Sequence, residues 1–439
     1  MRPKSTSFPT IVVTNNDPDP AGPSGRPEKY RIRYTVTKTG ERIPLLVDAV
    51  GAPVLAATVY VFSELRARGR AVNTIDATLR SILLFSLFLD IYEIDLQERL
   101  RAGQLLRLRE IDALVQICRL PVDQVRAFIK PIASSNVRLL RRASSQRSSP
   151  TSVKSAFCAT RLRSIRDYVE WLAVSGFATG SRYSGSMAVT LQAFTKALNS
   201  RMPVSHSRLR SEREGLDRNE VDELLRIVDP TAPDNPWTDK HTRVRNQLIV
   251  WWLVYLGVRR GELLGVRVSD LNFRNETATI HRRADDKDDP RLYQPNAKTQ
   301  ARELPMSSAL AQRTREYVIS FRNCVEGARK QDFLFVATDT GRPLSINGFA
   351  KIFYALQEHP LLPQKLFAHL LRHTWNDRLS EQMDENATPE EAERKLRSYL
   401  MGWSETSGTA STYTRRHVRR KAAEASVAMQ NSLFKGRAQ

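Results

Sequence analysis

The stretch HLLRH, residues 369–373, puts two histidines and an arginine within one turn of a predicted helix. His369, Arg372 and His373 are spaced i, i+3 and i+4, so their side chains should project from one face. Two histidines four residues apart could hold a metal ion, but the arginine between them would repel one. The glutamate of an HExxH motif is missing and no third ligand follows nearby, which argues against zinc. The arginine suits an anion, which its guanidinium can bind as a fork.

Other side chains with useful chemistry are spread over the second half of the chain. Arg259 stands in LGVRRGELLGV (256–266), where it follows an apolar segment at the mouth of a turn. Glu262, three residues further on, is able to pair with it. Three more groups follow along the chain: Lys298 at the tip of a predicted hairpin, Trp403 after a glycine, and Tyr413 ten residues later.

Together these groups suit the cleavage of a phosphodiester. Two arginines can hold the non-bridging oxygens at any relevant pH, and a lysine on a hairpin can deliver a proton. A tyrosine can serve as the nucleophile. The indole N–H of Trp403 is a donor only, so it can hold a phosphate oxygen but cannot move a proton. Paired carboxylates are missing from the set, which argues against a two-metal nuclease.

In order and spacing these motifs resemble those of the tyrosine recombinase (lambda-integrase-like) family, which covers DNA integrases and DNA breaking–rejoining enzymes. The likeness covers roughly residues 216–418, and residues 54–199 match the family's helical DNA-clamping domain more loosely. Many members have histidine where this chain has Trp403. The matching motifs are GVRRGEL (257–263), AKTQ (297–300), HLLRH (369–373), LMGWS (400–404) and the segment around Tyr413.

The resemblance implies a role for each residue. Tyr413 attacks the phosphorus and forms a 3′-phosphotyrosyl link, and Lys298 protonates the departing 5′-oxygen. Because the link stores the bond energy, no ATP, metal or other cofactor is implied. The implied catalytic residues are Arg259, Lys298, His369, Arg372, Trp403 and Tyr413, with Glu262 and His373 in supporting roles.

The resemblance also implies the partners and leaves alternatives open. The implied partner is double-stranded DNA with paired half-sites, bound by a homo-oligomer in a tetrameric synapse, with accessory proteins possible. The implied task is integration or excision of a mobile element. A type IB topoisomerase, a catalytically inert DNA-binding accessory protein and a zinc hydrolase are the alternatives. Tyr399 competes with Tyr413 as nucleophile, but it lies within a helix predicted to begin at Thr388, where a packing role is expected.

The composition favours a nucleic-acid partner. Of 439 residues, 68 are Lys or Arg and 47 are Asp or Glu, which gives a formal net charge of +21. This excess suits a polyanion better than a small neutral substrate. The three cysteines lie far apart without a CxxC pair, which fits a reducing cytosol. The most apolar stretch, residues 248–258, is too short to span a bilayer, so we expect a soluble cytoplasmic protein, associated with the nucleoid of a bacterial-type cell.

The elements that must position these side chains are predicted to be mainly helical with a small antiparallel β-sheet, and the resemblance implies that they form a two-domain clamp. Local patterns predict two strands within 31–47 around a Thr-Gly turn, and a helix over 73–90 capped by Asn73. We expect five parts: a disordered segment at 1–28, a strand-like arm at 29–53, a helical core-binding domain with its linker at 54–205, a catalytic domain at 212–420, and a C-terminal helix at 421–439.

Further local predictions concern both halves. A helix is expected over 152–176, and an Asp cap before a helix that follows Leu216. Short strands are expected at 277–283, 291–295 and 301–306, with the turn carrying Lys298 between the last two.

Two further segments carry predictions about partners. Residues 124–166 hold ten Lys or Arg and no acid, which favours a phosphate-tracking surface, with Arg138, Arg141 and Arg142 as candidate DNA contacts, over a solvated loop. In the tail, Ala423, Val427 and Phe434 form an apolar stripe too thin to fold alone. The family resemblance implies that this tail packs on a neighbouring subunit; the alternative is docking on its own domain.

Overall fold

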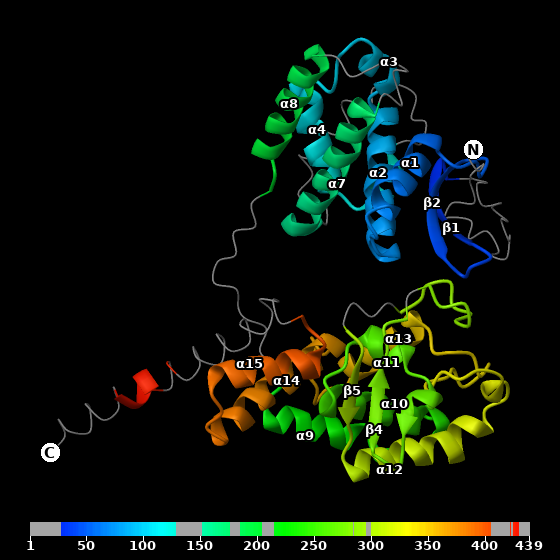
Figure 1. Cartoon of the computed structure of the whole chain (residues 1–439), viewed down its shortest axis with the longest axis vertical. Helices are drawn as coiled ribbons and strands as arrows, with labels where there is room; N and C mark the ends of the chain where they lie inside the picture. Colours follow the sequence, from blue (N-terminus) through cyan, green and yellow to red (C-terminus); the bar gives the residue numbers. More distant parts are fainter. Residues whose placement is uncertain are drawn as a thin grey trace, which may run out of the picture. The chain divides into compact units, whose positions relative to one another are not determined.

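The computed structural model describes residues 28–128, 152–175, 185–203, 215–283, 285–295, 300–404, 422 and 425–429. The chain divides into two compact units, Met1–Ser207 and Arg208–Gln439. The described part is mainly helical with small antiparallel sheets, which confirms the predicted fold class (Figure 1). No helix within that part is long and apolar enough to cross a membrane.

The first unit begins with an antiparallel hairpin of β1 (Tyr30–Val36) and β2 (Arg42–Asp48). Gly40 adopts a φ of 86° in the connecting turn, a backbone conformation that glycine reaches without steric cost. The two strands predicted around a Thr-Gly turn are therefore confirmed. The side chains of β2 are buried except at its last residue, because the strand lies against helix α2 (Val72–Ile91).

The helices of this unit pack around α2, which contacts the hairpin, α4, α5 and α7. Ile75 and Leu79 begin its buried stripe, and the helix predicted over 73–90 is confirmed. The predicted cap is wrong: the helix starts one residue before Asn73, and its N-cap position is Ala71, which makes no side-chain capping bond. The helices are α1 (Leu55–Tyr60, continued by a π-helical turn Val61–Arg66), α2 (Val72–Ile91), α3 (Leu96–Arg101), α4 (Leu108–Cys118), α5 (Val122–Ala127), α7 (Ser155–Val174) and α8 (Gly185–Ser200).

The second unit has its own core, with the buried helix α10 at its centre. The predicted Asp cap of α9 is confirmed, because the Asp217 carboxylate accepts a hydrogen bond from the Glu220 N–H at 2.8 Å. The helices are α9 (Arg218–Ile227), α10 (Lys240–Tyr255), α11 (Arg260–Gly265), α12 (Ser308–Glu316, continued by a π-helical turn Tyr317–Phe321), α13 (Ile346–Gln357), α14 (Ala368–Glu385) and α15 (Glu390–Met401).

A three-stranded antiparallel sheet lies in the same unit, with β4 (Thr277–Ile280) between β3 (Leu271–Asn272) and β5 (Arg302–Pro305). Strands within 277–283 and 301–306 were predicted and are confirmed. The predicted strand at 291–295 is wrong, since Arg291 is held by side-chain bonds and these residues form no ladder. The two-residue strand β3 was not predicted, because it is too short to show an alternating pattern.

Candidate active site

The turn that ends α10 brings Arg259 to the start of α11. Gly257 has a φ of 59°, and a Cβ atom there would lie 2.7 Å from the Trp375 ring and 3.1 Å from Met401 Cε. Only glycine fits, because it has no Cβ and tolerates positive φ. The left-handed turn leads directly to Arg259, which occupies the N-cap position of α11.

Arg259 is held by a carboxylate and a carbonyl. Its backbone N–H donates to Glu262 Oε2 at 2.9 Å, and its Nη1 donates to Glu262 Oε1 at 3.1 Å. The same Nη1 lies 3.2 Å from the Met401 carbonyl oxygen. The side chain stays 29% exposed, so its guanidinium combines fixed orientation with access to solvent.

Glu262 is a fully buried carboxylate that gathers three guanidinium groups. Besides Arg259, Arg302 donates to it from Nη2 at 2.9 Å and from Nη1 at 3.3 Å. Arg372 Nη1 lies 3.9 Å from Glu262 Oε2. Three positive charges around one negative charge leave a positive excess in surroundings of low dielectric constant, where charge interactions are strong. An anion is the partner that such a cluster suits.

Arg372 projects from α14 into the core of the unit rather than into solvent. Its Nη1 donates to the Gly257 carbonyl at 2.6 Å, and its Nη2 donates to the Met401 carbonyl at 3.2 Å. The side chain is almost completely buried. Because Arg372 and Arg259 share the Met401 carbonyl oxygen, the first motif and the HLLRH motif meet at one point, although 113 positions separate them in the sequence.

Trp403 lies beside these arginines because α15 ends in a left-handed turn. Gly402 has a φ of 64° at the C-cap, and the Trp403 N–H donates to the Ser398 carbonyl at 2.9 Å. The indole is buried against Met401 and Trp375, and Arg372 Cζ lies 5.6 Å from the ring centroid. Trp403 thus packs in the core and also contacts the Arg372 guanidinium.

The two histidines of HLLRH form a pair on α14. The rings of His369 and His373 are 4.6 Å apart between centroids and meet edge to face at 76°. The first is exposed and the second half-buried. The expectation that Arg372 shares their face is therefore only partly met, because its side chain turns inward. No group of three potential metal ligands occurs within the described ranges.

Lys298, Tyr413 and the arginines Arg138, Arg141 and Arg142 lie outside the described residues. The chain just after Lys298 is placed, however: the Gln300 N–H donates to the Gly402 carbonyl at 3.1 Å. This bond puts Gln300 next to Gly402, the residue that precedes Trp403.

The alternative nucleophile, Tyr399, lies in α15, which begins at Glu390 with Pro389 at the N-cap position. The predicted cap at Thr388 is wrong. The expectation that Tyr399 packs inside the unit is also wrong, since it is 58% exposed. The burial argument against this residue therefore does not hold, and the choice between the two tyrosines depends on the family motif.

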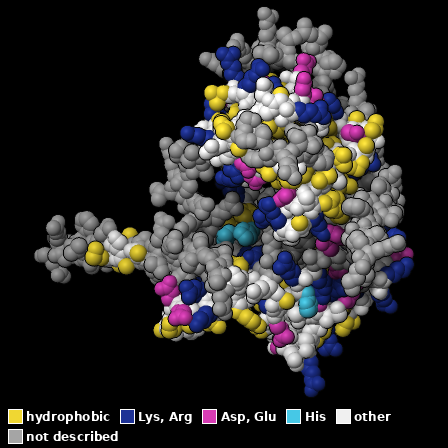
Figure 2. Space-filling model, turned by 45° about the horizontal axis from the view of Figure 1, so that its top comes forward, with side chains coloured by type: hydrophobic (Ala, Val, Ile, Leu, Met, Phe, Trp, Pro, Cys, Tyr) yellow, Lys and Arg dark blue, Asp and Glu magenta, His cyan; other side chains and the backbone are white. Residues whose placement is uncertain are grey.

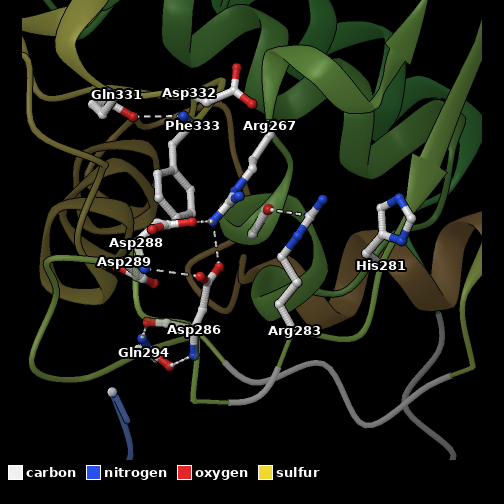
Figure 3. A network of polar contacts seen from close by, with 12 residues as sticks. Arg267, His281, Arg283, Asp286, Asp288, Asp289, Gln294, Gln331, Asp332 and Phe333 are labelled. Atoms are coloured by element: carbon white, nitrogen blue, oxygen red, sulfur yellow. Dashed lines mark hydrogen bonds and ion pairs between the residues drawn. The ribbon is translucent and has the colours of Figure 1, made fainter. Parts of the chain in front are cut away.

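A second polar network anchors the segment between β4 and β5 that leads toward Lys298 (Figure 3). Arg267 Nη2 donates to Asp286 Oδ2 at 2.6 Å, and Gln294 Nε2 donates to the Asp286 carbonyl at 2.6 Å. Arg291 pairs with Asp289 at 2.8 Å and reaches the Leu264 and Leu344 carbonyls. Asp286 thus ties the segment to Arg267, which follows α11, and Arg291 ties it to Leu264 within α11.

Arg302 is the residue of the cluster that the motifs did not identify. Burial in β5 alternates, and Arg302 occupies an inward-facing position while Glu303 faces outward. A charged residue at an inward strand position needs a buried partner of opposite charge. In the sequence, the available signal was that Arg302 stands two positions before Leu304 and so shares the inward face of the strand.

Comparison with known protein families identifies the family to which the second unit belongs. Residues 214–420 match the phage integrase family. The chain therefore carries a catalytic domain of the phage integrase family, and its enzyme class is that of the tyrosine-type site-specific recombinases, which break and rejoin DNA. The resemblance found in the sequence is confirmed. No curated protein matches the chain.

Several solved structures share a distant likeness. The crystal structure of XerA recombinase is 13% identical, covering 84% of this chain and 98% of that one, with a TM-score of 0.33. The Tn1549 transposon integrase in complex with circular intermediate DNA is 17% identical, covering 71% and 98%, with a TM-score of 0.37. XerH site-specific recombinase bound to palindromic difH substrate is 16% identical, covering 75% and 87%, with a TM-score of 0.37. At these values the family assignment rests on the match of residues 214–420.

Proposed function

We propose that this chain cuts and rejoins DNA at specific sites through a covalent 3′-phosphotyrosyl intermediate on Tyr413, in the integration or excision of a mobile element. The observation that supports the proposal is the arrangement of Arg259 and Arg372. Both guanidiniums face the Glu262 carboxylate and both rest on the Met401 carbonyl, beside Trp403. A phosphate oxygen is charged and is a stronger acceptor than that carbonyl, so it can replace it.

The proposed reaction assigns one task to each group. Arg259 and Arg372 hold the non-bridging oxygens of the scissile phosphate, and Trp403 and His369 add hydrogen bonds. Tyr413 Oη attacks phosphorus, and the bond between phosphorus and the 5′-oxygen breaks. Lys298 gives a proton to the departing 5′-oxygen, and His369 helps to accept the proton of the tyrosine. Each donor lost should slow cleavage on the order of a hundredfold or more.

The nucleophile is tested by two matched substitutions. Tyr413→Phe should bind DNA as the wild type does but leave no SDS-resistant adduct on a nicked substrate taken from the DNA that flanks the gene. Tyr399→Phe, which removes the same hydroxyl from an exposed tyrosine of α15, should keep the adduct. An adduct that survives in the first variant and disappears in the second would assign the nucleophile to Tyr399.

The metal-free character is tested by the same adduct assay with EDTA, in which cleavage should persist. A requirement for a divalent ion in strand cleavage would contradict the proposed reaction.

Exchange of strands between two DNA duplexes distinguishes a recombinase from a type IB topoisomerase, which only relaxes a supercoiled circle. Failure of the wild type to form any adduct would leave a DNA-binding accessory role.

The partner we propose is double-stranded DNA with paired half-sites, bound by a homo-oligomer. Three of the four arginines that the structure describes in the acid-free segment contact other groups of the chain. Arg126 pairs with Glu28, Arg166 with Asp167, and Arg161 donates to the Cys118 and Leu120 carbonyls. The fourth, Arg163, is exposed. Arg138, Arg141 and Arg142 are the phosphate contacts that we propose for this segment.

A further inference from the structure

The C-terminal end of α15 offers three successive carbonyl groups to the candidate active site. The Leu400 oxygen accepts from Arg302 Nε at 2.7 Å, and the Met401 oxygen accepts from Arg259 Nη1 and Arg372 Nη2, each at 3.2 Å. The Gly402 oxygen accepts from the Gln300 N–H at 3.1 Å. The last carbonyls of a helix have no partner within it and carry partial negative charge, so they suit guanidinium groups.

Arg302 connects this helix end to the Glu262 carboxylate. Its Nη1 and Nη2 donate to the two oxygens of Glu262, while its Nε donates to the Leu400 carbonyl. Its side chain is only 1% exposed. One planar group therefore fixes two acceptors from different elements, α11 and α15.

A role in stability alone is a weak explanation for this arrangement. Burying an ion pair costs desolvation energy that the attraction between the charges often fails to exceed, and an apolar pair is commonly as stable. A buried ion pair can instead serve to hold the neighbouring groups in a fixed orientation. The groups that touch the Arg302 acceptors are Arg259 and Arg372, which both contact Glu262.

We propose that Arg302 is a positioning residue for the two catalytic arginines. It orients the Glu262 carboxylate and the end of α15, on which both guanidiniums rest, and it does not itself touch DNA. This inference rests on the proposed function of Arg259 and Arg372. A lysine has one nitrogen and no planar fork, so it cannot bind both Glu262 oxygens and the Leu400 carbonyl with the same geometry.

The first test uses Arg302→Lys in the full chain, with Arg322→Lys as the matched control. Arg322 is equally a buried arginine of the second unit, and it donates to the Phe333, Ala328 and Gln331 carbonyls, away from the cluster. At saturating protein and well below the melting temperature, Arg302→Lys should slow adduct formation on the order of a hundredfold, because small misplacement of catalytic groups is costly. DNA affinity should stay unchanged, and Arg322→Lys should cleave at the wild-type rate.

The second test asks whether Arg302 acts through Glu262. In a double-mutant cycle with Glu262→Gln, the loss caused by Arg302→Lys should disappear, because the carboxylate that it orients is gone. Melting temperatures of all four chains separate this coupling from unfolding, and Glu262→Asp replaces Glu262→Gln if the latter does not fold. Additive losses in cleavage, or cleavage by Arg302→Lys at the wild-type rate, would overturn the proposal.

A measurement without DNA separates this proposal from the proposed function. The Arg259 amide donates to Glu262 Oε2, so its hydrogen exchange should become faster in Arg302→Lys and stay unchanged in Arg322→Lys. If the wild type forms no adduct with any DNA, the proposed function fails. An Arg259 amide that exchanges in Arg302→Lys as it does in the wild type contradicts the positioning role directly.

Discussion

The positions of both candidate catalytic arginines depend on Gly257, a residue without a side chain. Its carbonyl receives Arg372 Nη1, and its left-handed turn leads to Arg259. The Trp375 ring and Met401 fill the space where a Cβ atom would stand. Any side chain at this position must therefore both strain the backbone and displace Trp375.

We expect Gly257→Ala to lower the free energy of unfolding by about 2 kcal/mol or more, from backbone strain and overpacking. It should also reduce cleavage, because both arginines move with the turn. Urea unfolding followed by fluorescence measures the first effect, since five of the six tryptophans lie in the second unit.

Gly265→Ala is the control for that substitution. A Cβ atom at Gly265 meets nothing within 4 Å, so this change should leave stability and cleavage close to the wild type. Equal losses in the two variants would show that the Trp375 contact is not the cause.

At the scale of elements, the sequence was informative where the signal is local. Alternation and turn glycines predicted the β1–β2 hairpin, and an acidic cap predicted the start of α9. The motifs around Arg259 and Arg372 could be found because family patterns record residue types at fixed spacing. The carbonyls of Leu400 and Met401 could not, because every residue has a carbonyl and only the folded backbone shows which ones receive arginines.

Arg302 was missed for a related reason. The pairing of β5 with Glu262 joins residues 40 positions apart in the sequence, and their contact depends on how the sheet lies against α11. The failed prediction of a strand at 291–295 has a similar cause. Arg291 anchors that segment through carbonyls of Leu264 and Leu344, which are distant in sequence.

Helix α10 contains a group whose protonation should weaken the fold in acid. His241 is buried with its Nδ1 3.0 Å from Thr338 Oγ1 and its Nε2 3.5 Å from Tyr317 Oη. Burial and the nearby Arg245 guanidinium lower the pKa of His241 from 6.5 to about 4, although Asp239 acts in the opposite direction. The imidazole is therefore neutral in the folded chain at neutral pH.

The sign of the effect follows from proton uptake. Between pH 6.5 and about 4 the unfolded chain binds the proton and the folded chain does not, so stability falls as the pH falls through this window. The full penalty is on the order of 3 kcal/mol. We expect urea unfolding of wild type to show this loss and His241→Gln to lack it. Parallel loss of stability in both chains would assign the acid sensitivity to other groups.

At the scale of the whole molecule, positive charge is widely distributed. In Figure 2, Lys and Arg side chains are spread over the visible face, with acidic side chains between them. The net charge of +21 therefore gives the surface a general attraction for DNA, which falls with salt. Specific assembly needs contacts of another kind, and apolar side chains in the C-terminal tail are candidates.

The described part of that tail presents apolar side chains to solvent. Residues 425–429 are helical, and Val427 is 53% and Met429 60% exposed. If this stretch docked on its own unit, Val427 would be buried, whereas in this structure the side chain of Val427 is exposed. A neighbouring subunit is the occupant that we propose for the stripe of Ala423, Val427 and Phe434.

Deletion of residues 422–439 should therefore spare the binding of one protomer to a half-site but abolish the higher-order complex and strand exchange. Val427→Asp should reproduce the deletion, because a carboxylate in an apolar contact between subunits is costly to desolvate. Ser426→Asp adds the same charge at the neighbouring exposed position without removing an apolar group, and it should assemble normally. Gel-shift and recombination assays measure the two steps separately. Normal assembly and exchange by the truncated chain would show that assembly does not need contacts from the tail. Equal losses in Val427→Asp and Ser426→Asp would indicate an effect of charge alone.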